Sequence, residues 1–456
     1  MTTTYPIITF EIIGGGTLEF TREQIISADI IEENKPVSID LPISTLELSL
    51  YVSDDTFSMF EQSSYSVLAE RTPILVYENV NGDARLIGKF YLDKWRNPNE
   101  RKIEVTAIDI IGVLENTEFD GVFFASPTLL SEAITQVFSP INLTVDYDAL
   151  FEDQYISGWI PSGTYRQALQ HLCFAGNATA YTARSLNLVI ASISLPNLLY
   201  ETRVRDNAKI NKSTELLPLV SRIEIISHNY NLSDTLTTIF EKYLEPGSYK
   251  IVFDKPYGDI AVSGSGYSQF VLGTEGEDYI GTEGGDYIEA GGEYNIGSNA
   301  VYLTVADAGI VSITGYEWID NTYAFTFDET GTNEATNKNI IKITDATLVN
   351  LNNGQAVLDN VRDYYRQRYV QKLKLLPSEI ATGDNILSTT LYSNYVLGNV
   401  HRMDLDLTGG FTAMTEIRGI VPAFALAEEH PTRRARAGLA ISGAGMTRNN
   451  KWRNYA

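Results

Sequence analysis

A cysteine and a histidine two residues apart are the first place in the chain where residue types could support chemistry. Cys173 is the only cysteine among the 456 residues, and His171 lies just before it. A thiol beside an imidazole could act as a nucleophile and its base. Both residues also fall on or beside the apolar stripe of an expected helix, so we favour a structural role in packing for them.

The pattern of cysteines and histidines does not indicate a metal-binding site. The single cysteine excludes a zinc cluster of thiolates and an internal disulfide framework. No histidine has a second one three to five positions away, which is the spacing that places two imidazoles on one metal. The sequence therefore predicts no metal site and no cofactor. The four histidines are His171, His228, His401 and His430.

Two acidic octads follow one another at residues 273–280 (GTEGEDYI) and 281–288 (GTEGGDYI). Calcium-binding β-helices use acidic, glycine-rich repeats, but their period is nine and they need several turns. Two octads are too few, so a tandem duplication in an exposed hairpin is the favoured interpretation. Weak calcium binding through Asp278, Asp286 and neighbouring glutamates is the alternative.

Other catalytic signatures are missing from the sequence. There is no Gly-x-Ser-x-Gly elbow, no phosphate-binding Gly-x-x-x-x-Gly-Lys-Ser/Thr loop and no His-Glu-x-x-His pair. Gly264 and Gly266 begin like a dinucleotide loop, but Gln269 stands where a glycine is required. With 58 carboxylates, only geometry could identify a glycosidase pair. We predict no catalytic residue and a protein that is not an enzyme.

The net charge of −24 is unevenly distributed. Residues 431–456 carry six basic side chains and no acidic one, so removing these charges leaves −30 for residues 1–430. Such a body repels phosphate and should not bind nucleic acid tightly, although solubility alone would also explain an acidic excess. No apolar run reaches the length of a membrane span, and the first residues lack a secretion signal, so we expect a soluble protein made in the cytoplasm.

Residues 1–118 have the alternation of antiparallel strands. Leu46, Leu48 and Leu50 share one face of a strand, and Asn81-Gly82 predicts a tight hairpin between two others. The pattern favours a first antiparallel barrel or sandwich, closed by a turn at 109–114.

Residues 119–200 read as a small α/β module. Ser126 and Pro127 predict the cap and first turn of a helix that stops before Pro140. A second helix is capped by Thr164 and ends at Gly176-Asn177, and two strands follow around a turn at 183–185.

The rest of the chain returns to strands. Residues 201–237 and 316–420 are expected to form a second β-barrel that contains a helix at 354–369 and a hairpin turning at 409–410. A glycine- and tyrosine-rich β-domain, residues 238–315, is inserted into it, and a basic tail, residues 421–456, follows. The fold class is thus mainly β: two antiparallel tube-type β-barrels, a middle α/β domain and an inserted β-domain.

A set of motifs follows in order along the chain, at residues 88–92, 103–114, 119–121, 165–177, 342–348, 356–365 and 403–411. In this colinear order they resemble the central tail-tip or baseplate hub proteins of tailed bacteriophages. The last three motifs look like the second-barrel segment of hubs from phages and prophages of Gram-positive bacteria. The likeness spans about residues 5–420, and the octads and the basic tail lie outside the pattern.

The resemblance implies a ring-shaped homotrimer at the tail tip of a virion, assembled in the cytoplasm of the host bacterium. Two similar barrels in each of three chains would match a sixfold tail tube to a threefold tip. The ring would enclose a channel for the tape-measure protein and for DNA, which passes without specific binding. The implied partners are a distal tail or tail tube protein, the tape-measure protein and a tip spike or fibre protein.

Two other functions stay open at this point. In a receptor-binding or glycan-binding tail protein, tyrosines of the inserted domain at 238–315 could stack on sugar rings. A cell-wall hydrolase is the second alternative, although only about 40 residues follow the second barrel, which leaves no room for an appended enzyme.

Overall fold

The computed structural model is that of a mainly β protein with few helices. Among its described residues, no helix is long and apolar enough to cross a membrane. The structure describes residues 4–12, 16–37, 40–53, 68–192, 202–203, 212–264, 267–272, 299–329, 339–375, 380–390 and 395–422.

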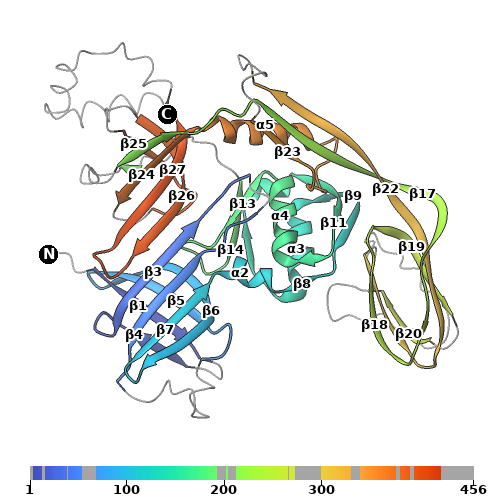
Figure 1. Ribbon diagram of the computed structural model, residues 1–456, viewed down its shortest axis with the longest axis horizontal. Helices are drawn as coiled ribbons and strands as arrows, with labels where there is room; N and C mark the ends of the chain where they lie inside the picture. The colour runs from blue at the N-terminus through green and yellow to red at the C-terminus, as the bar shows by residue number, and fades with distance from the viewer. Residues whose placement is uncertain are drawn as a thin grey trace.

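One large sheet of 13 strands draws on both ends of the chain (Figure 1). Its order is β16-β24-β27-β26-β3-β4-β7-β6-β5-β1-β2, with β25 beside β26 and β15 beside β25. The N-terminal half consists of β1 (Thr4–Glu11), β2 (Thr17–Phe20), β3 (Ile25–Glu33), β4 (Thr45–Tyr51), β5 (Pro73–Val80), β6 (Asp83–Asn99) and β7 (Lys102–Ile108). The C-terminal half consists of β15 (Thr202–Arg203), β16 (Ser213–Leu216), β24 (Tyr369–Leu375), β25 (Asn385–Thr389), β26 (Tyr395–Asp406) and β27 (Thr412–Ile420).

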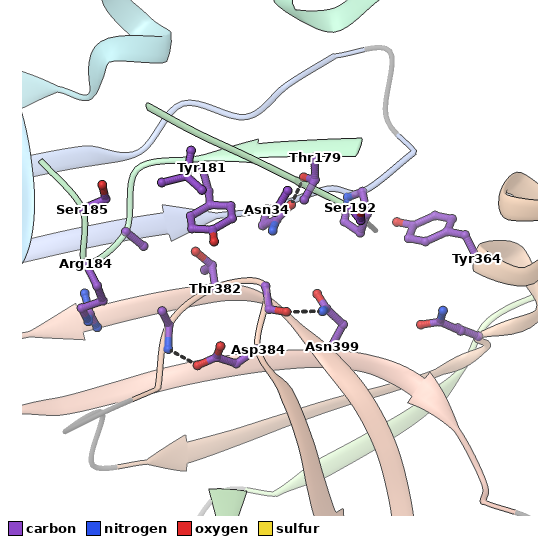
Figure 2. Close-up of a pocket in the computed structure, with 17 residues that line it drawn as sticks. Asn34, Thr179, Tyr181, Arg184, Ser185, Ser192, Tyr364, Thr382, Asp384 and Asn399 are labelled. Carbon is purple, nitrogen blue, oxygen red and sulfur yellow. Dashed lines mark hydrogen bonds between the residues drawn. The ribbon is translucent and has the colours of Figure 1, made fainter. Parts of the chain in front are cut away.

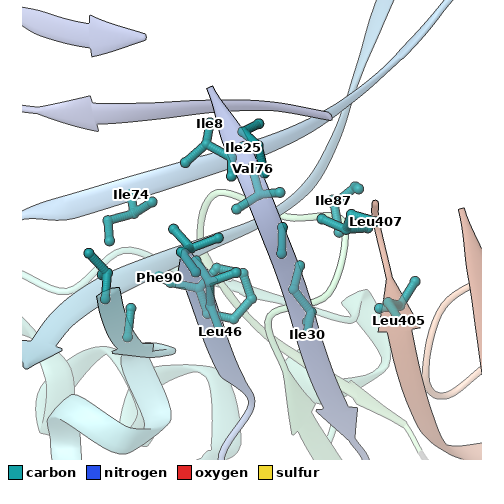
Figure 3. Packing of buried hydrophobic residues seen from close by; sticks show 14 of the residues in the cluster. Ile8, Ile25, Ile30, Leu46, Ile74, Val76, Ile87, Phe90, Leu405 and Leu407 are labelled. Carbon is teal, nitrogen blue, oxygen red and sulfur yellow. The ribbon is translucent and has the colours of Figure 1, made fainter. Parts of the chain in front are cut away.

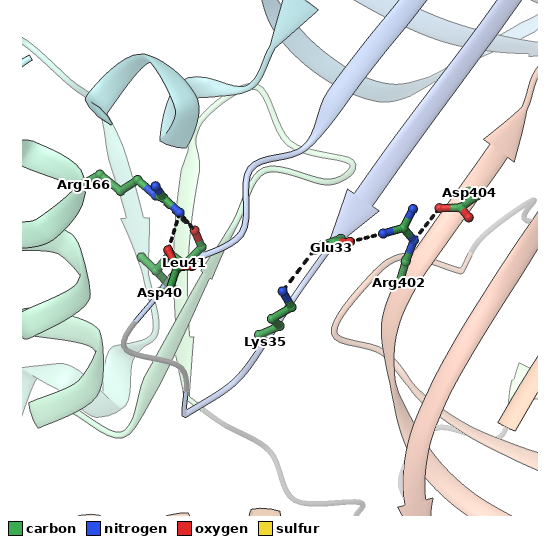
Figure 4. Close-up of polar contacts among 7 residues, drawn as sticks. All are labelled: Glu33, Lys35, Asp40, Leu41, Arg166, Arg402 and Asp404. Carbon is green, nitrogen blue, oxygen red and sulfur yellow. Dashed lines mark hydrogen bonds and ion pairs between the residues drawn. The ribbon is translucent and has the colours of Figure 1, made fainter. Parts of the chain in front are cut away.

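The two halves join where β26 pairs antiparallel with β3, from Arg402 opposite Glu33 to Asp406 opposite Asp29. The apolar faces merge as well: Leu405 and Leu407 belong to the same buried cluster as side chains of the N-terminal half, such as Ile30 and Ile87 (Figure 3). On the exposed side of this joint, the Arg402 guanidinium contacts Glu33 and Asp404 (Figure 4).

The expectation of two closed barrels is therefore corrected. In the part of the chain that the structure describes, the strand order runs as an open path and no pairing closes either half on itself. The physical reason is that β3 and β26 pair with each other, which satisfies an edge of each half and joins their buried side chains in one cluster.

The hairpin at Asn81-Gly82 is confirmed. Val80 pairs with Asp83 across a two-residue turn, and both turn residues have positive φ, 55° and 102°. Asparagine and glycine tolerate this conformation better than other residues, which is why the dipeptide specified the turn.

The α/β module lies between the large sheet and a long β-arm (Figure 1). Its helices are α2 (Ile110–Glu115), α3 (Leu130–Phe138) and α4 (Tyr165–Ala175), with 3₁₀ turns at Ser139–Ile141 and Ala149–Glu152. Its strands are β8 (Glu118–Phe119), β9 (Val122–Leu129), β10 (Val145–Tyr147), β11 (Tyr155–Ile160), β12 (Gly163–Thr164), β13 (Ala178–Tyr181) and β14 (Leu188–Ser192).

Two local predictions for this region were wrong. The turn predicted at 109–114 is instead helix α2, Ile110–Glu115, because the Asp109 carboxylate caps it by accepting a hydrogen bond from the Gly112 N–H. Ser126 and Pro127 lie in strand β9 and not at a helix start; α3 begins at Leu130. Pairing of β9 with β11 overrides the local helix signal, and Pro127 lies where the register of that pairing shifts, so its missing N–H interrupts no regular ladder.

The second predicted helix is confirmed in detail. Thr164 caps α4 through a reciprocal capping box with Gln167, and Asn177 takes the left-handed conformation just after the helix. On its N-terminal turn, Arg166 binds Asp40 and the Leu41 carbonyl, which ties the helix to the chain that leaves β3 (Figure 4).

A two-stranded arm extends away from the large sheet (Figure 1). β17 (Arg222–Leu244) and β22 (Gly309–Asp328) pair along nearly their whole length, with β23 (Ile340–Ile343) and β19 (Tyr257–Gly264) at their sides. The arm carries a lobe with strands β18 (Gly247–Val252), β20 (Tyr267–Leu272) and β21 (Ala300–Val305). Helix α5 (Gly354–Arg366), predicted at 354–369, packs against the arm's base.

The boundaries predicted for an inserted domain at 238–315 fall within the two long strands of the arm. β17 and β22 run through both proposed boundaries without a break, and they pair in a sheet separate from that of β24 to β27. The division of the chain into domains stays a prediction. The octads at 273–288 and the basic residues after 431 lie outside the described residues.

Because the two halves share one core, we expect Leu405→Ala to destabilise both. Leu405 is 2% exposed, and removing a buried leucine costs about 2–5 kcal/mol of unfolding free energy. Hydrogen exchange should show faster amide exchange in β4 as well as in β27. The control is Met414→Ala on β27, where 38% of the side chain is exposed. Faster exchange confined to the C-terminal strands would contradict a shared core.

Candidate functional site

A cavity of about 470 Å³ lies at the joint between three parts of the chain (Figure 2). The N-terminal half contributes Asn34 at the end of β3, and the module contributes the β13–β14 hairpin with Tyr181. The C-terminal part of the chain contributes Asp384 and Asn399, from its half of the large sheet, and Tyr364, from α5. Its walls are therefore assembled only when all three parts are packed together.

A buried ion pair stands beside this cavity. Arg184 occupies the turn of the β13–β14 hairpin with φ of 61°, and its guanidinium lies 2.5 Å from the carboxylate of Glu32 on β3. It also donates to the carbonyl oxygens of Ile87 and Ile380, at 2.9 and 3.1 Å. One side chain thus connects the module to both halves of the large sheet.

Burial dominates the electrostatics of this pair. Glu32 is only 1% exposed, and its removal from water raises the pKa of the carboxyl above the usual range. The Arg184 guanidinium offsets part of that rise. The pair holds the joint together as long as both partners are present, since an unpaired buried charge is costly.

Several polar side chains that line the cavity are hydrogen-bonded to its own walls. Its lining contains neither histidine nor cysteine, and its acidic residue, Asp384, accepts a hydrogen bond from the Ala381 N–H. Close by, His401 stacks on Tyr364, with ring centroids 5.7 Å apart. Burial, with a contribution from Arg418, lowers the pKa of His401 to about 3, so the ring is neutral at ordinary pH.

A second hollow, the arm-base groove, has a volume of about 550 Å³. It lies where β9 and β11 of the module meet the start of β17, the end of β22 and the loop before α5. Neutral amides and aromatic rings dominate its lining: Asn229, Asn231, Asn321, Asn350, Asn352, Phe123, Phe124, Tyr230 and Tyr323, with His228 at one side.

The lobe at the end of the arm also contacts the module. Lys250 and Tyr302 of the lobe both bind the carboxylate of Asp120, and the Trp159 indole donates to the Asn299 side chain. These contacts are polar, so the lobe is held against the module by directional bonds in addition to its connection through the arm.

The structure separates the residues that the sequence singled out. Cys173 is buried in the module core, and burial raises the pKa of its thiol, which disfavours the thiolate that a nucleophile requires. The Nδ1 atom of His171 lies 3.2 Å from the Thr347 hydroxyl, and burial lowers the pKa of His171 to about 4. Packing explains both side chains.

The other histidines are equally dispersed. The Nδ1 atom of His228 lies 2.7 Å from the Asp320 carboxylate, and its Nε2 atom lies 2.9 Å from the Thr344 carbonyl oxygen. His430 lies outside the described residues. Within the ranges that the structure describes, no three His, Cys, Asp or Glu side chains gather as a metal site would require.

Sequence reasoning missed both hollows. Arg184 gave no signal, because its partner Glu32 lies 152 residues away. The asparagines of the arm-base groove come from positions between 229 and 352, so no spacing rule could group them. Their only local signal was the presence of closely spaced pairs at 229 and 231 and at 350 and 352.

Comparisons with known proteins give distant likenesses only. No protein-family model matches the chain, and no curated protein matches it. Among solved structures, the 43 kDa tail protein of prophage MuSo2 from Shewanella oneidensis is similar at 10% identity and a TM-score of 0.48, covering 91% of this chain and 98% of that one. A tail protein from Neisseria meningitidis MC58 has 10% identity, a TM-score of 0.47 and coverages of 91% and 96%. Prophage tail protein gp18 from Listeria monocytogenes EGD-e has 8% identity, a TM-score of 0.44 and coverages of 92% and 97%.

We expect Arg184→Met to destabilise the fold by about 3 kcal/mol, because it leaves the Glu32 charge buried and unpaired. Burial raises the pKa of Glu32 in the folded protein, so ionisation of this carboxyl lowers the free energy of unfolding as the pH rises. Without the arginine, the ionised carboxylate has no partner to offset this cost. The loss in Arg184→Met should therefore be larger at pH 8 than at pH 5 in urea unfolding.

The matched control is Arg402→Met, which removes a more exposed arginine, 40% accessible, from Glu33 at the same joint. Its cost should be about 1 kcal/mol or less and should depend weakly on pH. Equal losses in the two variants would contradict a special role for the buried pair.

His401 should make the protein sensitive to acid. Its pKa falls from 6.5 to about 3 on folding, so its contribution to stability is complete above pH 6.5 and is lost as the pH falls towards 3. Between pH 7.5 and pH 5, the wild type should lose about 2 kcal/mol more than His401→Gln. Parallel pH profiles of the two proteins in chemical unfolding would rule this explanation out.

Proposed function

We propose that this chain is a structural protein of a phage or prophage tail, and specifically the hub of the tail tip. Three copies would form a ring that joins a sixfold tail tube to a threefold tip. The ring would surround the channel for the tape-measure protein and for DNA. The partners would be a distal tail or tube protein above and a spike or fibre protein below.

The continuous sheet is the observation that carries the proposal. Two β-rich halves from opposite ends of the chain lie edge to edge through β3 and β26. Three such chains would place six halves side by side in a ring. The sheet path ends at β2 and at β16 in the described residues. An unpaired strand edge presents backbone groups on which a neighbouring copy can build.

The two ends of the path suit such a contact. β16 exposes Leu216, with 54% of the side chain accessible, and its burial pattern is exposed throughout. Because all four residues of β16 are exposed, packing within its own chain stabilises this strand little. In a ring, β2 of the next copy would pair with it and cover it. The motifs that resemble hub proteins lie in these same halves, at 88–92, 103–114 and 403–411.

Charge supports passage of DNA rather than binding. Residues 1–430 carry a net charge of −30, and phosphate contacts to basic side chains are what make nucleic-acid binding tight. A ring built from such a body would let DNA slide through without holding it. We therefore propose a structural role for the chain and assign no reaction to it.

The deciding experiment is a measurement of native mass combined with electron microscopy of the purified chain. The proposal requires a particle of three 50.7 kDa chains that appears as a ring with a central hole. A protein that stays monomeric at every concentration, or that forms compact dimers without a hole, would overturn it.

A single backbone change tests the strand edge. The Ile12 N–H donates to the Gly16 carbonyl, so by the alternation of antiparallel pairs the Glu19 N–H points away from β1. Glu19→Pro should therefore leave the monomer folded but block pairing with another copy, which shifts the native mass from trimer to monomer. Glu19→Ala keeps the N–H and should stay trimeric. A trimeric Glu19→Pro protein would exclude β2 as the contact edge.

A further inference from the structure

The arm-base groove is built by asparagines that are already engaged. The Asn350 side-chain amide donates to the carbonyl and hydroxyl oxygens of Ser157, and its oxygen accepts from the Asn352 N–H at 2.8 Å. The Asn229 side chain accepts from the Leu351 N–H and donates to the Asn321 carbonyl. These bonds fix the loop before α5 against the arm and the module, so the walls of the groove are preformed.

Aromatic rings stiffen the module side of the groove. Phe123 lies 4.6 Å from the ring of Trp318 and 5.4 Å from that of Tyr230, and His228 stacks on Tyr230 at 6.5 Å. Because these rings pack on one another, the groove has little freedom to collapse. A volume of about 550 Å³ lies within the range that small-molecule sites occupy.

Several polar groups of the groove remain uncommitted. Among the described residues, the side chains of Asn231 and Asn352 make no hydrogen bond, and the Tyr323 hydroxyl makes none either. Tyr323 is 55% exposed, so the face of its ring is available as well. Planar amides that both donate and accept, next to an open aromatic face, are complementary to the hydroxyls and the apolar face of a sugar ring.

The electrostatics of the groove select against charged ligands. None of its lining residues is Lys, Arg, Asp or Glu. Its single histidine is held between the Asp320 carboxylate and the Thr344 carbonyl, so it offers no free cation. An anionic ligand would meet no lysine or arginine in this lining and would be repelled by the acidic body of the chain.

We propose that the arm-base groove binds a neutral oligosaccharide. Tyr323 stacks on one sugar ring, while Asn231 and Asn352 exchange hydrogen bonds with its hydroxyls. This activity is independent of the proposed hub function, and it places sugar recognition at the base of the arm rather than on the tyrosines of residues 238–315.

The test is saturation-transfer NMR and calorimetry on the full chain. The probes are linear trisaccharides of glucose and of N-acetylglucosamine, a neutral polysaccharide fraction from Gram-positive cell walls, and a glycerol phosphate polymer. At least one neutral probe should bind, and the anionic polymer should not. Tyr323→Ala and Asn231→Leu should each weaken binding by about tenfold, which corresponds to the loss of one stacking or hydrogen-bond contact.

The matched control is Tyr243→Ala, which removes a tyrosine of similar exposure, 57%, from the same strand pair but outside the groove. It should bind the probe as the wild type does. The proposal is overturned if no neutral probe binds, if Tyr323→Ala and Asn231→Leu bind normally, or if the anionic polymer binds best. All variants should keep the native mass of the wild type, so failure here is distinguishable from failure of the hub proposal.

Discussion

The pairing of β26 with β3 is the constraint on which the rest of the structure depends. A strand edge must pair its backbone groups, and here the two halves of the large sheet pair with each other and share one buried cluster. Without this pairing, two β-sheets would expose their apolar edges and the cavity at the joint would not exist. The two ends of the chain therefore meet in one sheet, and the α/β module and the arm are formed by the residues between them.

Polar contacts give this joint its specificity. A core made only of aliphatic side chains would tolerate small slips between the halves, whereas the Glu32 carboxylate and the Arg184 guanidinium must meet at one place. The same arginine binds carbonyl oxygens of Ile87 and Ile380, so the hairpin of the module is aligned with both halves at once. Burial makes the loss of one partner costly, and it also strengthens the attraction between the two charges because less water screens them.

The arm is stabilised differently from the large sheet. Its two long strands have little core of their own along most of their length, and register shifts after Leu232 and Thr238 change their course towards the lobe. At its base the arm packs on α5 and borders the groove, and at its end the lobe is bound to Asp120. A β-ribbon held at both ends keeps the lobe in place without a large apolar interface.

The sequence alone determined the local structure wherever the conformational preferences of a few neighbouring residues are sufficient. Asn81-Gly82 requires positive φ, and Thr164 with Gln167 closes a helix end, so the hairpin and α4 could be predicted residue by residue. Mainly β character followed from alternation. Only the tertiary structure decided that Pro127 lies in a strand, that the two halves share one sheet, and that Arg184 meets Glu32. These outcomes depend on pairing between segments more than 25 residues apart, and the free energy of such contacts is not encoded in the spacing of either segment alone.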